Sequence, residues 1–244
     1  MLRPSFPARS LLAAAALCIP APPGHADPAP SIDAGQPSVA DTGRGASAAR
    51  LSPEAKAAAE AGIAAMAKEN FDAAETAFQK LLSLSPDNIS ALINLGLVEF
   101  RLGRAEASQK YLERAIRLKP DAALAWMILG VIYSNQDDIP AATAALAQAV
   151  YLNPKSPQAH NYFAVTLSRR GWYSAAEDEL QRAIELDPNF AEAHFNLALT
   201  YLQRNPPAVE LARRHYQKAL DLGAPPDPDV AAKLAAAPEQ TVAP

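Results

Sequence analysis

Cysteine is almost absent from this chain, and glycine and aromatic residues are scarce. The 244 residues include one cysteine, Cys18, with 10 glycines and 7% aromatic residues. A single thiol excludes an intramolecular disulfide and a zinc site built on several cysteines. Half of the residues are hydrophobic, so alanine and leucine supply most of the apolar content. This balance favours closely packed helices over a sheet rich in aromatic and β-branched residues.

A basic surface is also missing. The formal net charge is −4, and removal of residues 1–26 would take away Arg3 and Arg9 and no acid, which changes −4 to −6. Nucleic acids and anionic membranes are bound by clusters of lysine and arginine. We therefore expect neither as a partner.

The motifs of common catalytic sites are absent from the sequence: it has no phosphate-binding glycine loop, no GxSxG and no HExxH. His160 and His194 lie 34 residues apart, which would separate them by a helix-packing distance of about 8–10 Å, too far to share one ion. The consecutive acids Glu177, Asp178 and Glu179 point in different directions around a helix. We expect no enzymatic activity, no cofactor and no metal site.

Residues 1–26 have the features of a secretory signal peptide. Arg3 and Arg9 precede the apolar run Leu11–Ile19, and Gly24-His25-Ala26 offers a cleavage site after Ala26. The run is shorter than the ~20 residues needed to span a bilayer. The prediction is a periplasmic or secreted protein without a stable membrane span.

Two other interpretations of this segment fit less well. A lipoprotein signal would use Cys18, but Leu17 before it is bulkier than the residue usual there. A mitochondrial transit peptide would be richer in arginine and serine and less continuously apolar. Residues 27–50 are dominated by proline, alanine, glycine and serine, which predicts a disordered linker.

Four prolines recur at a constant interval. Pro86, Pro120, Pro154 and Pro188 are each 34 residues apart and end the similar segments LSLSP, IRLKP, VYLNP and IELDP. A period of 34 is typical of helix-turn-helix repeats. In the segment around Gly130, the spacing of large and small residues also resembles the tetratricopeptide repeat family.

This resemblance covers residues 55 to about 226. It implies an all-α fold, an α-solenoid of about five helix-turn-helix units with a C-terminal capping helix, preceded by the disordered linker. The array spans 51–226, with units 55–88, 89–122, 123–156, 157–190 and 191–226, and is followed by a capping helix and disordered tail at 227–244. The fifth unit fits only with two extra residues in the turn at 205–207.

Small residues at fixed positions explain how each unit packs. Counted from the start of a unit, positions 8, 20 and 27 of the third unit are Gly130, Ala142 and Ala149, and position 24 is Leu146. Small residues let two helices approach closely while the leucine fills the remaining space. Local signals also predict helix starts at Ser52, Asp121, Ser156 and Asn189, turns at Gly103 and Gly171, and a last helix after Asp227.

The resemblance also implies a concave groove formed by the first helix of each unit, which faces a protein or peptide partner. The groove residues that it predicts are Ile93, Leu97, Phe100, Arg101, Met127, Val131, Asn161, Val165, Arg169, Phe195, Leu199, Leu202 and Gln203. Family members that clamp an acidic C-terminal peptide have lysine at position 5 and asparagine at position 9, a combination that is missing here. The predicted groove is largely apolar, which favours an amphipathic helix or an extended apolar segment as the ligand.

Three roles remain open at this point. The chain is predicted to be a non-catalytic interaction scaffold or adaptor in the cell envelope. The alternatives are a self-associating protein, whose groove is filled by a second copy, and an accessory subunit of an envelope complex. The sequence does not name a partner for Glu99, which stands at position 11, where Tyr133 and Tyr201 stand in other units.

Overall fold

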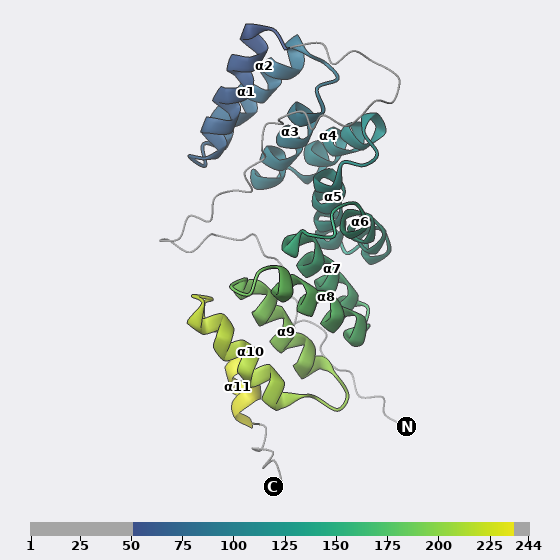
Figure 1. The fold of residues 1–244 in the computed structure, drawn as a ribbon, viewed down its shortest axis with the longest axis vertical. Coiled ribbons are helices and arrows are strands. Elements are labelled where there is room, and N and C mark those ends of the chain that lie inside the picture. The colour runs from purple at the N-terminus through teal and green to yellow at the C-terminus, as the bar shows by residue number, and fades with distance from the viewer. Residues whose placement is uncertain (1–50, 237–244) are drawn as a thin grey trace, which may run out of the picture. The chain divides into compact units, whose positions relative to one another are not determined.

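The computed structural model describes residues 51–236, which consist of helices and connecting turns and contain no strand (Figure 1). The predicted signal peptide, linker and C-terminal tail lie outside the described residues. None of the described helices is both long enough and apolar enough to cross a membrane. The helices are α1 (Pro53–Met66), α2 (Phe71–Leu84), α3 (Ile89–Arg101), α4 (Ala105–Leu118), α5 (Ala123–Asn135), α6 (Ile139–Leu152), α7 (Pro157–Arg169), α8 (Tyr173–Leu186), α9 (Ala191–Gln203), α10 (Val209–Asp221) and α11 (Pro228–Ala236).

The helices repeat with the stride that the prolines predict. The first helices α3, α5, α7 and α9 begin at residues 89, 123, 157 and 191, and the second helices α2, α4, α6 and α8 begin at 71, 105, 139 and 173. Each series advances by 34 residues. Helix α10 begins 36 residues after α8, because the turn at 205–207 carries the two extra residues. The prediction of repeated helix-turn-helix units in an all-α fold is confirmed.

Residue contacts divide the described residues into an N-terminal unit, which ends at Ser108, and a C-terminal unit, which begins at Gln109. In the N-terminal unit, α2 contacts both α1 and α3. A Cβ atom on Gly62 would lie 2.5 Å from the ring of Phe78, so α1 and α2 meet where no side chain would fit. Ser108 takes the place of a small apolar residue and donates a hydrogen bond of 2.6 Å to the carbonyl oxygen of Gly96.

The C-terminal unit contains three complete helix pairs, α5 with α6, α7 with α8, and α9 with α10. Helix α6 also contacts α7, and α8 contacts α9. A Cβ atom on Gly130 would lie 2.4 Å from Cγ of Leu146, and both Ala142 and Ala149 are fully buried. The small residues at positions 8, 20 and 27 therefore do bring the paired helices together.

Helix α11 covers the last repeat. Its side chains Val230 and Leu234 are buried in the same core as α9 and α10. The Tyr216 hydroxyl donates to the carbonyl oxygen of Asp227 and accepts from the Asp227 backbone N–H. The prediction of a terminal capping helix is confirmed, since an uncapped last pair would leave apolar surface in water.

Two of the four predicted helix starts are correct. Ser52 and Ser156 accept hydrogen bonds from backbone N–H groups three residues later. The predictions at Asp121 and Asn189 are wrong, because α5 and α9 begin one residue further on and have no side-chain cap. The caps that the sequence reasoning missed are Asn70, Asn88 and Asp138.

The turn inside each of the first four units has a left-handed residue at position 15. Gly103 and Gly171 have φ angles of 74° and 77°, as their place in the turn predicts, while Glu69 and Asp137 adopt φ angles of 53° and 64° at the equivalent position. Side chains other than glycine are strained in this region by about 1–2 kcal/mol. Glu69 and Asp137 are therefore less suited than glycine to the left-handed conformation of their turns.

Replacing these turn residues should change stability in opposite directions. Glu69→Gly relieves the strain at an exposed position and is expected to raise the free energy of unfolding by about 0.5–1 kcal/mol. Gly103→Ala introduces the same strain and should lower it by about 1 kcal/mol. Urea unfolding followed by circular dichroism measures both. A loss of stability in Glu69→Gly would contradict the strained turn.

Candidate protein-binding surface

The predicted groove residues lie on three of the first helices in the C-terminal unit and on α3 in the N-terminal unit. On α3, the side chains of Ile93, Leu97 and Phe100 are partly exposed and Arg101 is exposed. In the C-terminal unit the partly exposed members are Met127, Val131, Val165, Arg169, Phe195, Leu199 and Leu202, the exposed member is Gln203, and the buried one is Asn161. Twelve of the thirteen predicted side chains thus reach the surface.

The first helices of the C-terminal unit are neighbours. Helix α7 contacts α5 on one side and α9 on the other. Val131, Val165 and Leu199 occupy position 9 of successive units, and all three are partly exposed. We call the surface formed by Met127, Val131, Val165, Phe195, Leu199 and Leu202 the first-helix face. It is apolar along all three helices.

Two of the polar residues predicted for the groove are engaged within the repeats. Arg169 donates from Nη1 to the backbone and hydroxyl oxygens of Ser134 and forms an ion pair of 2.7 Å with Asp137. It therefore ties α7 to the preceding unit. Asn161 is fully buried, which corrects the expectation of an exposed polar point there.

Asn161 belongs to a polar contact between α7 and α9. Its Oδ1 accepts a hydrogen bond of 2.9 Å from Nδ2 of Asn196. Next to it, the hydroxyl of Thr200 donates to the carbonyl oxygen of Asn196 and lies 3.1 Å from the hydroxyl of Ser168. Polar groups buried together in this way fix the register of two helices, because each needs its partner to replace water.

The sequence reasoning did not single out Glu192. It is the second residue of the fifth unit and the one acid of α9. Burial raises the pKa of Glu192, and the neighbouring Asn161 amide has a smaller effect in the opposite direction. Its place three and seven residues before the predicted groove residues Phe195 and Leu199 was the signal that could have identified it.

Phe195 has two roles. It was predicted to face the groove, and it is partly exposed. Its ring also packs against Tyr216 on α10, with the ring centroids 6.2 Å apart. The second helix of the same unit therefore fixes the position of the Phe195 ring on α9.

Position 4 of the third, fourth and fifth units carries a ring nitrogen that contacts the preceding turn. Trp126 Nε1 donates to the carbonyl oxygen of Pro120 at 2.8 Å, and His160 and His194 contact those of Pro154 and Pro188 through Nε2 at 3.1 and 3.2 Å. The histidines thus replace the tryptophan in structure as well as in sequence. Among residues 51–236, no group of three or more histidine, cysteine or acidic side chains is placed to hold a metal ion.

His160 is surrounded by acceptors. Its Nδ1 contacts Oε2 of Glu179, and its Nε2 contacts the Pro154 carbonyl. Burial lowers the pKa of His160, but the hydrogen bonds to Glu179 and to Pro154 outweigh burial, so that the pKa is raised overall. Because both nitrogens face groups that only accept, the charged imidazolium suits this site.

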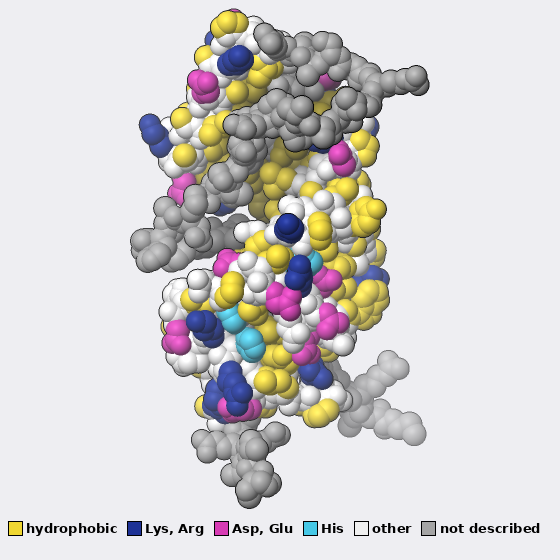
Figure 2. Space-filling model, viewed as in Figure 1, with side chains coloured by type: hydrophobic (Ala, Val, Ile, Leu, Met, Phe, Trp, Pro, Cys, Tyr) yellow, Lys and Arg dark blue, Asp and Glu magenta, His cyan; other side chains and the backbone are white. Residues whose placement is uncertain are grey.

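His194 has a different partner at the equivalent place. Its Nδ1 lies 3.0 Å from Nδ1 of His215, and the two rings stack. Since the Pro188 carbonyl can only accept, Nε2 of His194 carries the proton and His215 must donate to Nδ1. Burial is the main reason that the pKa of each histidine is lowered. The nearby Lys218 lowers the pKa of His194 further, and His194 lowers that of His215 further. Histidines gather at the surface over α9 and α10 (Figure 2).

Glu99 has the partner that the sequence did not reveal. Its carboxylate is buried and accepts a hydrogen bond of 3.3 Å from Nη1 of Arg104, which also pairs with Glu75 at 2.9 Å. The hydrogen bond to Glu75 is the main reason that the pKa of Arg104 is raised. In the fifth unit, Tyr201 at the same position donates to Glu177. The residue at position 11 is thus linked to an acid of the preceding unit, Glu99 through Arg104 to Glu75 and Tyr201 directly to Glu177.

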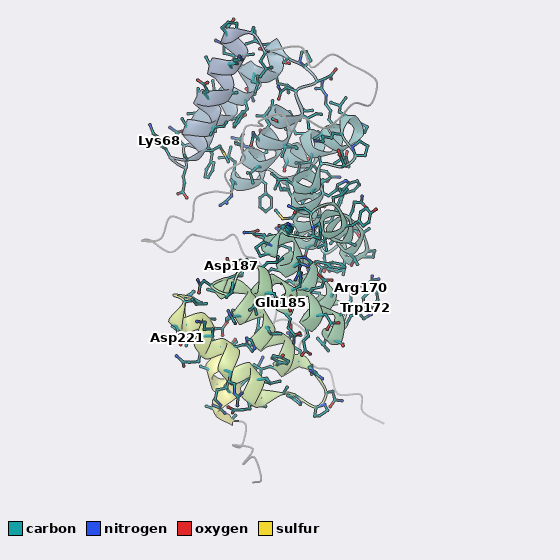
Figure 3. All side chains as sticks on the ribbon, in the orientation of Figure 1. Lys68, Arg170, Trp172, Glu185, Asp187 and Asp221 are labelled. Carbon is teal, nitrogen blue, oxygen red and sulfur yellow. The ribbon has the colours of Figure 1, made fainter. Side chains whose placement is uncertain are left out.

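An aromatic residue is exposed away from the first-helix face. Trp172 lies at the turn between α7 and α8, where the guanidinium carbon of Arg170 is 4.4 Å from its ring centroid. Both side chains project outward together (Figure 3). A cation over an indole ring stabilises an exposed contact by about 0.5–1 kcal/mol, which accounts for this pair without a ligand.

The two histidine pairs should respond to acid in opposite ways. The lowered pKa of His215 means that the unfolded chain binds more protons, so this pair loses stability as the pH falls below about 6.5. The raised pKa of His160 contributes stability that is fully present below about 6.5 and is lost as the pH rises through the folded pKa.

Thermal unfolding at pH 5.5 and 7.5 separates these effects. His215→Gln keeps a donor for His194 but does not titrate, so acidification should destabilise it less than the parent. Glu179→Gln replaces the carboxylate that favours charged His160 with a neutral amide, and acidification should destabilise this variant more than the parent. Identical pH dependence in both variants and the parent would show that the pairs do not form.

Family models support the assignment that the repeat stride predicts. A model described as tetratricopeptide repeat matches residues 59–108 and 93–160, and one described as TPR repeat matches 166–204. Together they cover more than half of the chain. A comparison with curated proteins gave no match.

Solved structures show the same fold. A crystal structure of MamA protein is 25% identical, with a TM-score of 0.57, and the alignment covers 69% of this chain and 91% of that one. MamA from Desulfovibrio magneticus RS-1 is 16% identical with a TM-score of 0.61, covering 70% and 96%. YrrB, described as a TPR protein with an unusual peptide-binding site, is 22% identical with a TM-score of 0.56, covering 75% and 97%. With its repeats matched by family models over most of the helical array, this chain belongs to the tetratricopeptide repeat family.

Proposed function

We propose that this protein is a non-catalytic scaffold of the cell envelope, which binds an apolar or amphipathic segment of another protein on its first-helix face. Tetratricopeptide repeat proteins serve as protein-interaction scaffolds and are generally non-catalytic.

The observation that carries the proposal is the row of partly exposed apolar side chains on the first-helix face. Val131, Val165 and Leu199 repeat at one position of three successive contacting helices, and each is left partly exposed. In a helix pair that served only stability, these positions would be covered or polar. Apolar side chains that remain in contact with water over several neighbouring helices are typical of a partner surface.

The polar residues around this face support an apolar ligand. Arg169 is neutralised by Asp137, and position 5 of the three units holds Met127, Asn161 and Phe195, with no lysine. A surface of this kind has no cationic clamp for an acidic peptide terminus. An amphipathic helix or an extended apolar segment complements it, because either buries apolar area along the row.

Residues 1–26 support the envelope location. Their charged start, apolar run and small residues before Asp27 are those of a secretory signal. A protein delivered in this way would meet its partner outside the cytoplasm.

Placing a charge on the first-helix face should weaken partner binding without unfolding the protein. Met127→Glu and Leu199→Glu each put a carboxylate where the partner's apolar side chains would lie, and an unpaired charge buried in an interface is unfavourable by several kcal/mol. Tyr151→Glu is the matched control, because Tyr151 is 79% exposed on the second helix α6.

Cross-linking in intact cells followed by mass spectrometry identifies the partner, and binding is then measured with purified protein. Both face variants are expected to lose at least tenfold in affinity, with retained helicity by circular dichroism, while Tyr151→Glu binds as the parent does. Parental affinity in both face variants would reject the surface. If cross-linking finds no other partner, and the parent self-associates with rising concentration in light scattering while both face variants do not, the occupant is a second copy of this chain.

A further inference from the structure

The acid Glu192 borders the first-helix face and has no counter-ion among the described residues. It lies three and seven residues before Phe195 and Leu199, so the three side chains share one side of α9. Glu192 forms no ion pair with any residue in the described part of the chain, and it is only partly exposed. Carboxylates are rarely buried to this extent unless they are paired.

The neighbouring helices offer no cation to Glu192. Helix α5 has no lysine or arginine, α9 has none, and the one arginine of α7, Arg169, is bound to Asp137. On α8 and α10, Arg182, Arg213 and Arg214 are paired with acids of their own helices, and the charge of Lys218 acts on His194 and not on Glu192. The start of α9 provides a helix dipole, which stabilises an acid by about 0.3–1 kcal/mol. This is less than the cost of partly burying the charge.

A second polar group beside Glu192 is also incompletely satisfied. Asn161 is fully buried, its Oδ1 is used by Asn196, and its Nδ2 has no hydrogen-bond partner among the described residues. The amide is close enough to Glu192 to favour the ionised carboxylate, although no full hydrogen bond forms between them. An orphaned buried amide next to an unpaired acid is the kind of exception that needs an explanation.

We propose that Glu192 is a specificity residue that receives one lysine or arginine of an otherwise apolar partner segment. This inference rests on the proposed function and names the chemistry of its ligand. The aliphatic stem of the partner's cation packs on Phe195 and Leu199, while its head bonds to the carboxylate. The bound cation holds Glu192 ionised and oriented toward Asn161, so that both polar groups gain the partner they lack.

The probes are amphipathic helical peptides of leucine, alanine and phenylalanine that differ at one central residue. The central residue is lysine, the uncharged norleucine of similar length, or glutamate. Binding to the full chain is measured by fluorescence anisotropy at pH 7.5. The parent is expected to bind the lysine peptide about tenfold more tightly than the norleucine peptide, and the glutamate peptide least tightly.

Glu192→Gln should abolish the preference for lysine and leave the norleucine affinity unchanged. The control Glu210→Gln removes the same charge from the first turn of α10 and should keep the preference. As the pH falls through the raised pKa of Glu192, the parent should bind the lysine peptide less tightly and the norleucine peptide as before. Equal binding of both peptides by the parent overturns the inference.

The two proposals fail in different ways. If the norleucine peptide binds and Leu199→Glu weakens it, the first-helix face is a binding surface whatever the role of Glu192. If none of the peptides binds, both proposals are rejected for this ligand class. If Glu192→Gln abolishes self-association seen by light scattering, the cation comes from a second copy of this chain and the inference of a separate partner is wrong.

Discussion

The close approach of two helices within each unit is the constraint on which the rest depends. Gly62 faces the Phe78 ring and Gly130 faces Leu146 at distances that leave no room for a Cβ atom. A large side chain of the second helix occupies this space, and the first helices also contact the helices of neighbouring units. The remaining side, which carries Val131, Val165 and Leu199, is left partly in water. The packing that gives stability thus produces the surface proposed for binding.

Polar contacts then fix how successive units meet. The ring N–H groups of Trp126, His160 and His194 anchor the prolines that end the preceding units. Arg169 joins α7 to the turn after α5, and Asn196 joins α9 to Asn161 on α7. Apolar contacts alone would tolerate sliding between helices. Directional bonds at each step hold neighbouring first helices in one register, which keeps the apolar row of the C-terminal unit continuous.

The sequence predicted the helices well because local spacing determines them, whereas it missed partners that depend on folding. The stride of the prolines and the small residues such as Gly130 follow from neighbours in one helix pair. Glu99 is paired through Arg104 with Glu75, and His194 meets His215 only after the extra residues at 205–207 shift the alignment. Asn161 was placed in the groove by its repeat position, but a neighbouring asparagine draws it into the α7–α9 contact. The one-residue errors at Asp121 and Asn189 arose because the path of the turn, and not the best capping residue, sets the start of those helices.

The central claim is that helix contact at Gly130 and Leu146 builds the unit, and a double-mutant cycle on the free energy of unfolding tests it most directly. Gly130→Ala should lower this free energy by about 1–3 kcal/mol because it overfills the contact, and Leu146→Ala by about 2–5 kcal/mol because it leaves a cavity. In the double variant the new methyl group enters the vacated space, so the predicted loss is at least 1 kcal/mol smaller than the sum of the two single losses. Strictly additive losses, or a Gly130→Ala variant more stable than the parent, would contradict the close contact and the account built on it.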